Sequence, residues 1–183
     1  MFYLLGYFDQ AFAHPLAQAV GIVGMVLGIV WPLFRARRAL LVVQALCFFL
    51  FVVHFHLLGA ETGVWLNVLG GLQALAAIPL GTRPGFRYVY LATLPMAAAC
   101  VVLTWGGPPS LFAGLGVALT TWSRYQLDVS KLRLGANLGL CCWLVHNVLV
   151  LSVPGTITDL GGIIANTAMI RRERRRAAAA DPA

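Results

Sequence analysis

The feature that most constrains this chain is the recurrence of apolar runs long enough to cross a lipid bilayer, which takes about 17–25 residues in a helix. Only short polar connections separate the runs, and 60% of the 183 residues are hydrophobic while 10% are charged. The mean hydropathy is +0.84. The runs lie at about residues 17–34, 39–58, 63–80, 88–105, 110–126, 132–152 and 155–170. The sequence therefore predicts an all-α integral membrane protein with seven transmembrane helices.

The basic residues all fall on one side of this seven-span arrangement. They follow the first, third and seventh runs or bracket the connection after the fifth. They are Arg35, Arg37, Arg38, Arg83, Arg87, Arg124, Lys131, Arg133, Arg171, Arg172, Arg174, Arg175 and Arg176. The N-terminus and the other connections contain none. Because connections rich in lysine and arginine stay in the cytoplasm, we expect the N-terminus outside and the C-terminus in the cytoplasm.

The net charge of +7 has a simple explanation in this arrangement. The densest basic run, residues 171–176, comes directly after the last apolar run, where anionic lipid headgroups attract such charge. We therefore expect the bilayer, and not a nucleic acid, as its partner. The chain has no nucleophile elbow, P-loop or HExxH motif, and its six acidic residues are dispersed. The sequence predicts neither an enzyme nor a metal or cofactor site.

The chain also contains a weak internal repeat. The two segments that match are 21–78 and 113–170. His54 falls opposite His146. Asn67 falls opposite Asp159, or opposite Thr158 if the one-residue offset is placed earlier. Each segment holds three apolar runs, and the single run between them gives both the same orientation. The sequence therefore predicts two parallel triple-helix bundles joined by a linker helix, related by an axis along the membrane normal.

This 3+1+3 pattern predicts five regions. The N-terminal interfacial segment is 1–16, the first triple-helix bundle is 17–80, and the linker helix with its loops is 81–109. The second triple-helix bundle is 110–170, and the basic cytoplasmic tail is 171–183.

Several stretches together resemble the YgjV-type family of bacterial inner-membrane proteins. They are LAQAVGIVGMVLGIVWPLFRARR, VVHFHLLGA, TGVWLNVLGGLQ, TTWSRYQL and CCWLVHN. The resemblance implies a location in the bacterial cytoplasmic membrane, and the family has no established activity. Its architecture is similar to the SWEET/PnuC transporter group, in which a solute passes between two triple-helix bundles.

The SWEET/PnuC resemblance implies specific site residues. In that group the solute passes near asparagine and tryptophan on the third helix of each bundle. Trp65 and Asn67 match the first bundle, and Asp159 takes the place of the asparagine in the second. The Pro-Gln pair of the first SWEET helix is absent, since Pro32 is followed by Leu33. The resemblance therefore does not extend to the sugar-transport motif.

Polar residues inside the apolar runs are the other candidates, because ionisable groups are costly in a bilayer unless they are paired or hydrated. At 1.5 Å per residue, one tier lies about 18–24 Å from the basic side: His54, Asn67, His146 and Asp159. A lower tier lies within about 15 Å of that side: Gln44, Gln73, Asn137 and Asn166. The predicted substrate-binding residues are Asn67, Trp65, His54, His146, Trp143, Asp159 and Asn166.

We expect His146 to face the interface between the bundles, within hydrogen-bond or water-bridge reach of Asp159 or Asn67. Asn147 lies about 100° further around the helix and is expected to bond the backbone of a neighbouring span.

Three functions follow from these patterns. The first is transport of a small polar solute between the bundles, with protons relayed by Asp159 and a histidine. The second is a membrane scaffold or assembly protein that transports nothing. The third is an electron carrier that binds haem through His54 and His146. The sequence leaves a homo-oligomer open and does not identify the solute.

Overall fold

The structure, a computed structural model, describes residues 13–81 and 83–180. Within these ranges it contains seven long α-helices, short 3-10 turns and no strand. The helices are α2 (Pro15–Val30), α3 (Arg37–Leu57), α4 (Glu61–Ala77), α5 (Tyr88–Leu103), α6 (Pro108–Tyr125), α7 (Val129–Leu149) and α8 (Val153–Ala180). The all-α prediction is confirmed for the described residues. The N-terminal interfacial segment predicted at 1–16 lies mostly outside them.

Local signals explain where several helices begin and end. Gly59 follows α3 with a φ of 70°, and Gly107 precedes α6 with a φ of 89°, a region that glycine enters without steric cost. Pro108 opens α6, where its missing N–H would be unpaired in any case. Asp128 caps α7 by accepting a hydrogen bond from the backbone N–H of Lys131. These residues place the connections of the bundle.

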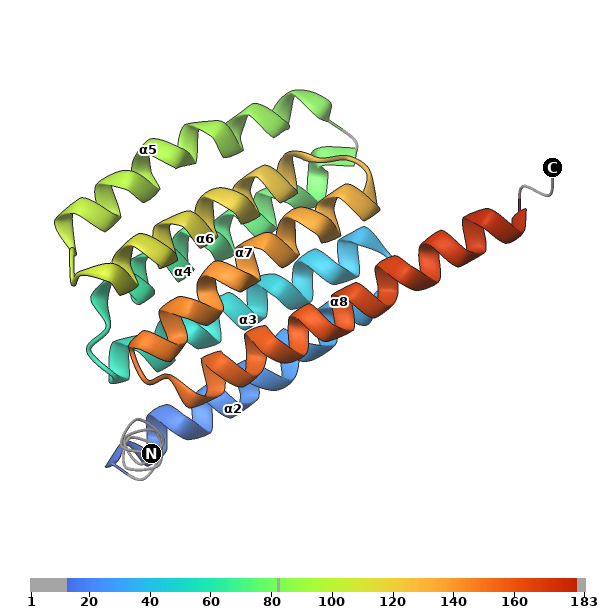
Figure 1. Ribbon diagram of the computed structural model, residues 1–183. Helices are drawn as coiled ribbons and strands as arrows, with labels where there is room; N and C mark the ends of the chain where they lie inside the picture. Colours follow the sequence, from blue (N-terminus) through green and yellow to red (C-terminus); the bar gives the residue numbers. More distant parts are fainter. Residues whose placement is uncertain (1–12, 82, 181–183) are drawn as a thin grey trace.

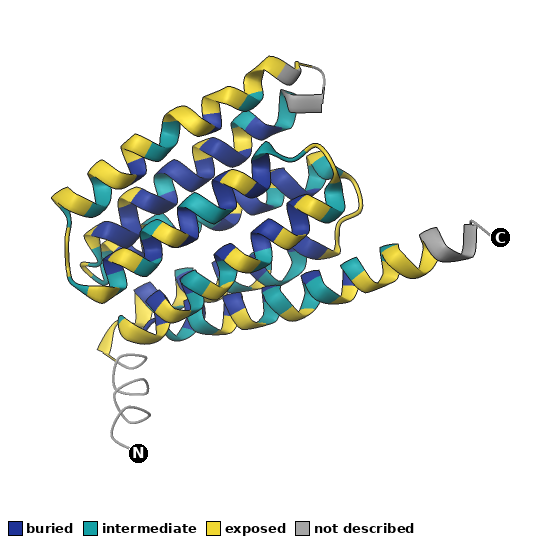
Figure 2. Cartoon of the chain, turned by 45° about the horizontal axis from the view of Figure 1, so that its top comes forward, coloured by how far each residue is buried: buried dark blue, intermediate teal, exposed yellow. Residues whose placement is uncertain are grey.

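Six of the helices form a closed ring around the core. Along the ring α2 packs on α3, α3 on α4, α4 on α6, α6 on α7, α7 on α8, and α8 on α2. Helix α5 lies outside the ring, against α6 and α4 (Figure 1). Figure 2 shows buried residues concentrated in the ring and α5 largely exposed. The space enclosed by the ring is therefore the interior of the molecule.

The outer surface of this bundle is apolar, as a lipid environment requires. Four described stretches are long and apolar enough to cross a membrane: Pro15–Leu33, Arg37–Leu57, Gly85–Leu103 and Val129–Leu149. Large apolar side chains on the other helices are exposed as well. Examples are Trp65, Leu72, Leu111, Leu115, Leu160 and Ile164.

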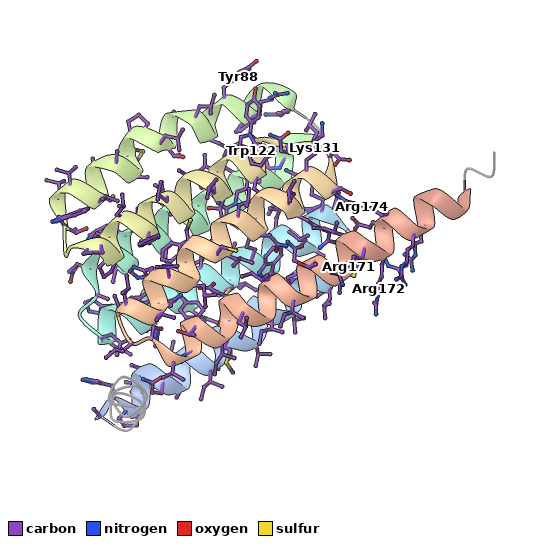
Figure 3. The ribbon with its side chains drawn as sticks, viewed as in Figure 1. Tyr88, Trp122, Lys131, Arg171, Arg172 and Arg174 are labelled. Carbon is purple, nitrogen blue, oxygen red and sulfur yellow. The ribbon has the colours of Figure 1, made fainter. Side chains whose placement is uncertain are left out.

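Basic residues gather at one end of the bundle, called here the basic end. Figure 3 shows Lys131, Arg171 and Arg172 at that end, and α8 continues beyond it (Figure 1). Two arginines that the sequence places beside the connection after α6 are instead fully buried. Arg124 is 1% exposed and Arg133 is 0% exposed. The basic end therefore includes an internal layer of positive charge.

Candidate functional site

A cavity of about 60 Å³ lies inside the ring. It has room for only a few water molecules. Residues from α3, α4, α6, α7 and α8 contribute to its wall. The polar ones are Gln44, Asn67, Thr120, Trp143, Asn147, Thr158 and Asp159. The cavity is therefore mainly apolar, with a few polar groups in its wall, and helices from both halves of the chain contribute to it.

One polar contact in the cavity wall joins two neighbouring helices. Asn147 Nδ2, on α7, donates a hydrogen bond to Asp159 Oδ2, on α8, at 2.7 Å. Gly155 makes room for this amide, because a Cβ atom there would lie 2.5 Å from Asn147 Cγ. Both polar residues are at most 5% exposed. The carboxyl group of Asp159 is thus held in place by α7.

Two polar atoms of the cavity wall have no hydrogen-bond partner among the described residues. They are Asn147 Oδ1 and Trp143 Nε1. The Trp143 ring packs closely on α6, since a Cβ atom at Gly116 would lie 2.7 Å from its Cδ1. A buried polar group without a partner costs about 1–3 kcal/mol. The cavity wall therefore carries unused hydrogen-bonding capacity.

Asn67 lines the same cavity from α4. It is 4% exposed, and its Nδ2 donates to the carbonyl of Gly63, one turn earlier, at 2.7 Å. Of the predicted site residues, the structure thus brings Asn67, Trp143 and Asp159 together at one cavity.

The two histidines lie outside the cavity wall and make matching contacts. His54 Nδ1 donates to the carbonyl of Ala17 at 2.9 Å, and His146 Nδ1 donates to the carbonyl of Pro109 at 2.8 Å. In each case the acceptor lies 37 residues earlier in the chain. His54 Nε2 also bonds Ser152 Oγ at 3.1 Å. Each histidine therefore ties the second helix of its half to the start of the first.

This arrangement corrects the expectations for His146 and Asn147. The observed partner of His146 is the Pro109 carbonyl, not Asp159 or Asn67, and Asn147 is the residue that reaches Asp159. Helix α7 is covered by protein on several sides, so both adjacent polar residues are buried.

The histidines are also poorly arranged to ligate a haem. The ring of Phe55 packs edge-on against both, with centroid distances of 5.2 Å to His54 and 5.8 Å to His146. A haem held between the two imidazoles would have to occupy the position of that ring. The two residues therefore do not fit a pair of axial ligands.

Arg124 and the glutamines of the lower tier form a network on the basic side of the cavity. Arg124 Nη1 donates to Gln73 Oε1 at 2.8 Å, and Nη2 donates to Gln44 Oε1 at 3.1 Å. Its guanidinium carbon lies 5.2 Å from the centre of the Phe48 ring. Gln44 and Phe48 also line the cavity. The network therefore joins the Arg124 cation to the cavity wall.

Arg133 organises the second network of the lower tier. Its Nε pairs with Glu173 Oε1 at 3.2 Å, and its Nη1 donates to Asn166 Oδ1 at 3.2 Å. Asn166 Nδ2 in turn donates to the Arg133 carbonyl at 2.7 Å and to Asn137 Oδ1 at 2.8 Å. Asn166, predicted to bind solute, thus belongs to this network and does not line the cavity.

Trp65, which the sequence predicts to bind the solute, does not line the cavity. Its side chain is 53% exposed, on the outer surface of α4. Residues two apart on a helix point about 200° away from each other, so Trp65 and Asn67 do not share a face.

Sequence reasoning missed Asn147, Thr120 and Arg124. The sequence does contain a signal for Thr120 and Arg124. They are the first and last residues of TTWSR, and residues four apart lie on the same face of a helix.

Comparisons with known proteins agree with the membrane assignment. The family model Imp-YgjV, described as "Bacterial inner membrane protein", matches residues 15–177, a range that covers nearly all of the described helices. The chain is similar to the inner membrane protein YgjV of Escherichia coli (strain K12). The two are 27% identical over 161 residues, which cover 84% of this chain and 82% of that protein. No solved structure matches the chain.

Proposed function

We propose, starting from the fact that the chain belongs to the Imp-YgjV family of bacterial inner membrane proteins, that it carries a small polar solute across that membrane. The observation that supports this most is the cavity inside the ring, lined by Asn67, Asn147 and Asp159. Polar groups in a membrane interior are costly unless they are paired or hydrated. A mainly apolar cavity with a few polar groups in its wall, two of them with unpaired atoms among the described residues, is the usual form of a small-molecule site.

The proposed transporter consists of two parallel triple-helix bundles, α2–α4 and α6–α8, joined by α5. The ring supports this division, because α4 meets α6 as α8 meets α2. The matching bonds of His54 and His146 support a repeat, since each joins equivalent positions in the two halves. All seven helices then cross the membrane, with the basic end in the cytoplasm. Parallel repeats of this kind bind their solute at the repeat interface.

Movement of one bundle against the other would open the site to either side in turn. The cavity of about 60 Å³ is too small for most metabolites, so solute entry requires the bundles to separate. Close contacts between the bundles run along α2 and α8, where a Cβ atom at Gly161 would lie 2.6 Å from Ile29 Cγ1. Separation of the bundles would therefore require α2 and α8 to shift against each other at this contact.

The test is uptake of radiolabelled solutes into liposomes that contain the purified protein. The solutes represent neutral, anionic, cationic and zwitterionic classes. At least one class is expected to enter faster than into empty liposomes. Asp159→Asn is expected to reduce its initial rate about tenfold or more, because charged hydrogen bonds contribute about 1.5–3 kcal/mol.

The matched control is Asp128→Asn. It makes the same acid-to-amide change in an exposed N-cap, where asparagine caps a helix as well as aspartate does. Its uptake is expected to equal that of the unsubstituted protein. Equal uptake by both variants, or no uptake of any class, contradicts the proposal.

A membrane scaffold is the second candidate, and one observation favours it. Most polar groups of the lower tier are bonded within the protein, as in the Arg133–Asn166–Asn137 network. A packed polar interior is what a static assembly protein requires. The scaffold is the better description if no solute class is transported or stabilises the protein against heating.

A further inference from the structure

The two fully buried arginines differ in how their charge is neutralised. Arg133 has a carboxylate partner, Glu173, in the one ion pair that the structure contains among its described residues. Arg124 is buried to the same extent, yet its bonded partners are the neutral amide oxygens of Gln44 and Gln73. Its Nε has no partner among the described residues. A buried charge is normally paired with an opposite one, but Arg124 has no counter-charge within the part of the chain that the structure describes.

Asp159 shows the reverse situation. It is 5% exposed, and its bonded partner is the neutral amide of Asn147. No described lysine, arginine or histidine forms an ion pair with it. Among the described residues, the ring therefore encloses an acidic group, Asp159, and a basic group, Arg124, that form no ion pair.

These two groups flank the same cavity. Asp159 lines it directly from α8. Arg124 lies one turn beyond Thr120, a lining residue of α6, and bonds Gln44, a lining residue of α3. The guanidinium is thus at the basic side of the cavity, one side chain away from it. With Asp159 ionised, the two groups would create a strong field across a site of low dielectric constant.

We propose that the transported solute is a small zwitterion, with its carboxylate directed toward Arg124 and its ammonium group toward Asp159. Such a molecule supplies both missing counter-charges at once, which a neutral, purely anionic or purely cationic solute does not. Asn147 Oδ1 and Trp143 Nε1 add an acceptor and a donor to the same wall. This assignment rests on the proposed function, since it names the solute class of the same cavity.

The test compares four probes of similar size: glycine, acetate, methylammonium and acetamide. Each is titrated at pH 7 into the purified protein, and the rise in melting temperature gives its Kd. Uptake into proteoliposomes is measured in parallel. Glycine is expected to stabilise the protein and to be taken up, with a Kd at least tenfold lower than that of the other three probes.

Two charge-removing variants, one charge-conserving variant and one control accompany the probes. Arg124→Gln and Asp159→Asn are each expected to raise the Kd for glycine about tenfold or more, the loss of one charged contact. Arg124→Lys keeps the cation and is expected to retain most of the binding. Lys131→Gln removes an exposed charge from the same end and is expected to leave the Kd unchanged. If Arg124→Gln does not fold, the four-probe comparison on the unsubstituted protein still decides.

The outcomes separate this inference from the proposed function. If acetamide, acetate or methylammonium binds as well as glycine, the zwitterion assignment is wrong while transport of a polar solute stands. The same holds if glycine binding survives both Arg124→Gln and Asp159→Asn. If no probe binds and no solute class is taken up, both the assignment and the transport function are wrong.

Discussion

At the scale of single residues, the contact between Asn147 and Asp159 matters most. It places a carboxyl group in the interior of a membrane protein, where an unsatisfied polar atom costs about 1–3 kcal/mol. The amide of Asn147 satisfies one oxygen of that group at 2.7 Å. Gly155 is the residue that permits the approach, because any side chain there would collide with the amide. The pair therefore depends on three positions in two helices.

Replacing one partner of this pair should cost more than replacing both. Asn147→Leu is expected to lower the free energy of unfolding by about 1–3 kcal/mol, because the buried oxygen of Asp159 loses its donor. Adding Asp159→Leu should restore part of that loss, since two apolar side chains leave no orphaned group. Thermal melting in detergent measures both. A double variant that is less stable than Asn147→Leu alone would contradict this account.

Residue positions were predictable only in part, for a geometric reason. Asn67 and Asp159 stand out as polar groups within apolar runs, and both line the cavity. The sequence predicts a backbone contact for Asn147 because it lies about 100° from His146 around the helix. An angle of about 100° would place the two side chains in different surroundings only if one of the two helix faces met lipid. Helix α7 packs on both α6 and α8, so polar groups on adjacent faces are buried.

At the scale of helices, the two histidines act as ties between elements. Each bonds the carbonyl near the start of the preceding helix, so α3 is tied to α2 and α7 to α6. The two ties differ in one respect. His54 uses both ring nitrogens, whereas His146 Nε2 has no partner among the described residues.

This difference gives a prediction that compares His54→Leu with His146→Leu. Each hydrogen bond contributes about 1 kcal/mol net. His54→Leu removes two and is expected to destabilise the protein by about 1 kcal/mol more than His146→Leu. Melting temperatures of the two purified variants measure this. Equal losses, or a larger loss for His146→Leu, would show that the Ser152 contact contributes nothing.

Helix positions were largely predictable because bilayer-length apolar runs locate them. The exceptions have local causes. Helix α7 begins at Val129, before the predicted 132, because Asp128 caps it. Helix α8 continues to Ala180, ten residues past the predicted end of the span. Arginine, glutamate and alanine are strong helix formers, so the helix persists where the apolar run stops.

At the scale of the whole molecule, the ring and the distribution of charge determine how the protein sits in the membrane. Which helices close the ring was not predictable from apolar runs, because every run has a similar length and composition. Helix α5 lies outside the ring, and few of its residues are buried. The gathering of basic residues at one end of the bundle was predictable, because they follow only alternate apolar runs along the chain.

The expected orientation is testable with reporter fusions. A reporter that is active only in the cytoplasm is expected to be active when fused after Met169, and inactive when fused near residue 60. A reporter that is active only in the periplasm should give the opposite pattern. The reason is the retention of basic connections in the cytoplasm. Reversed results at both positions would contradict the expected orientation but not the arrangement of the helices in the ring.

Helix α8 runs without a break from the interior of the bundle to beyond its basic end (Figure 1). The helix has 28 residues and is about 42 Å long at 1.5 Å per residue. Asp159 lies on it about 18 Å from Arg171, which is at the basic end of the bundle (Figure 3). A tilt of about 10° pivoting at Arg171 would displace Asp159 by about 3 Å, comparable to the length of its hydrogen bond to Asn147. A change that tilted the basic end of α8 at the membrane surface would therefore also move the carboxyl group of Asp159 in the interior.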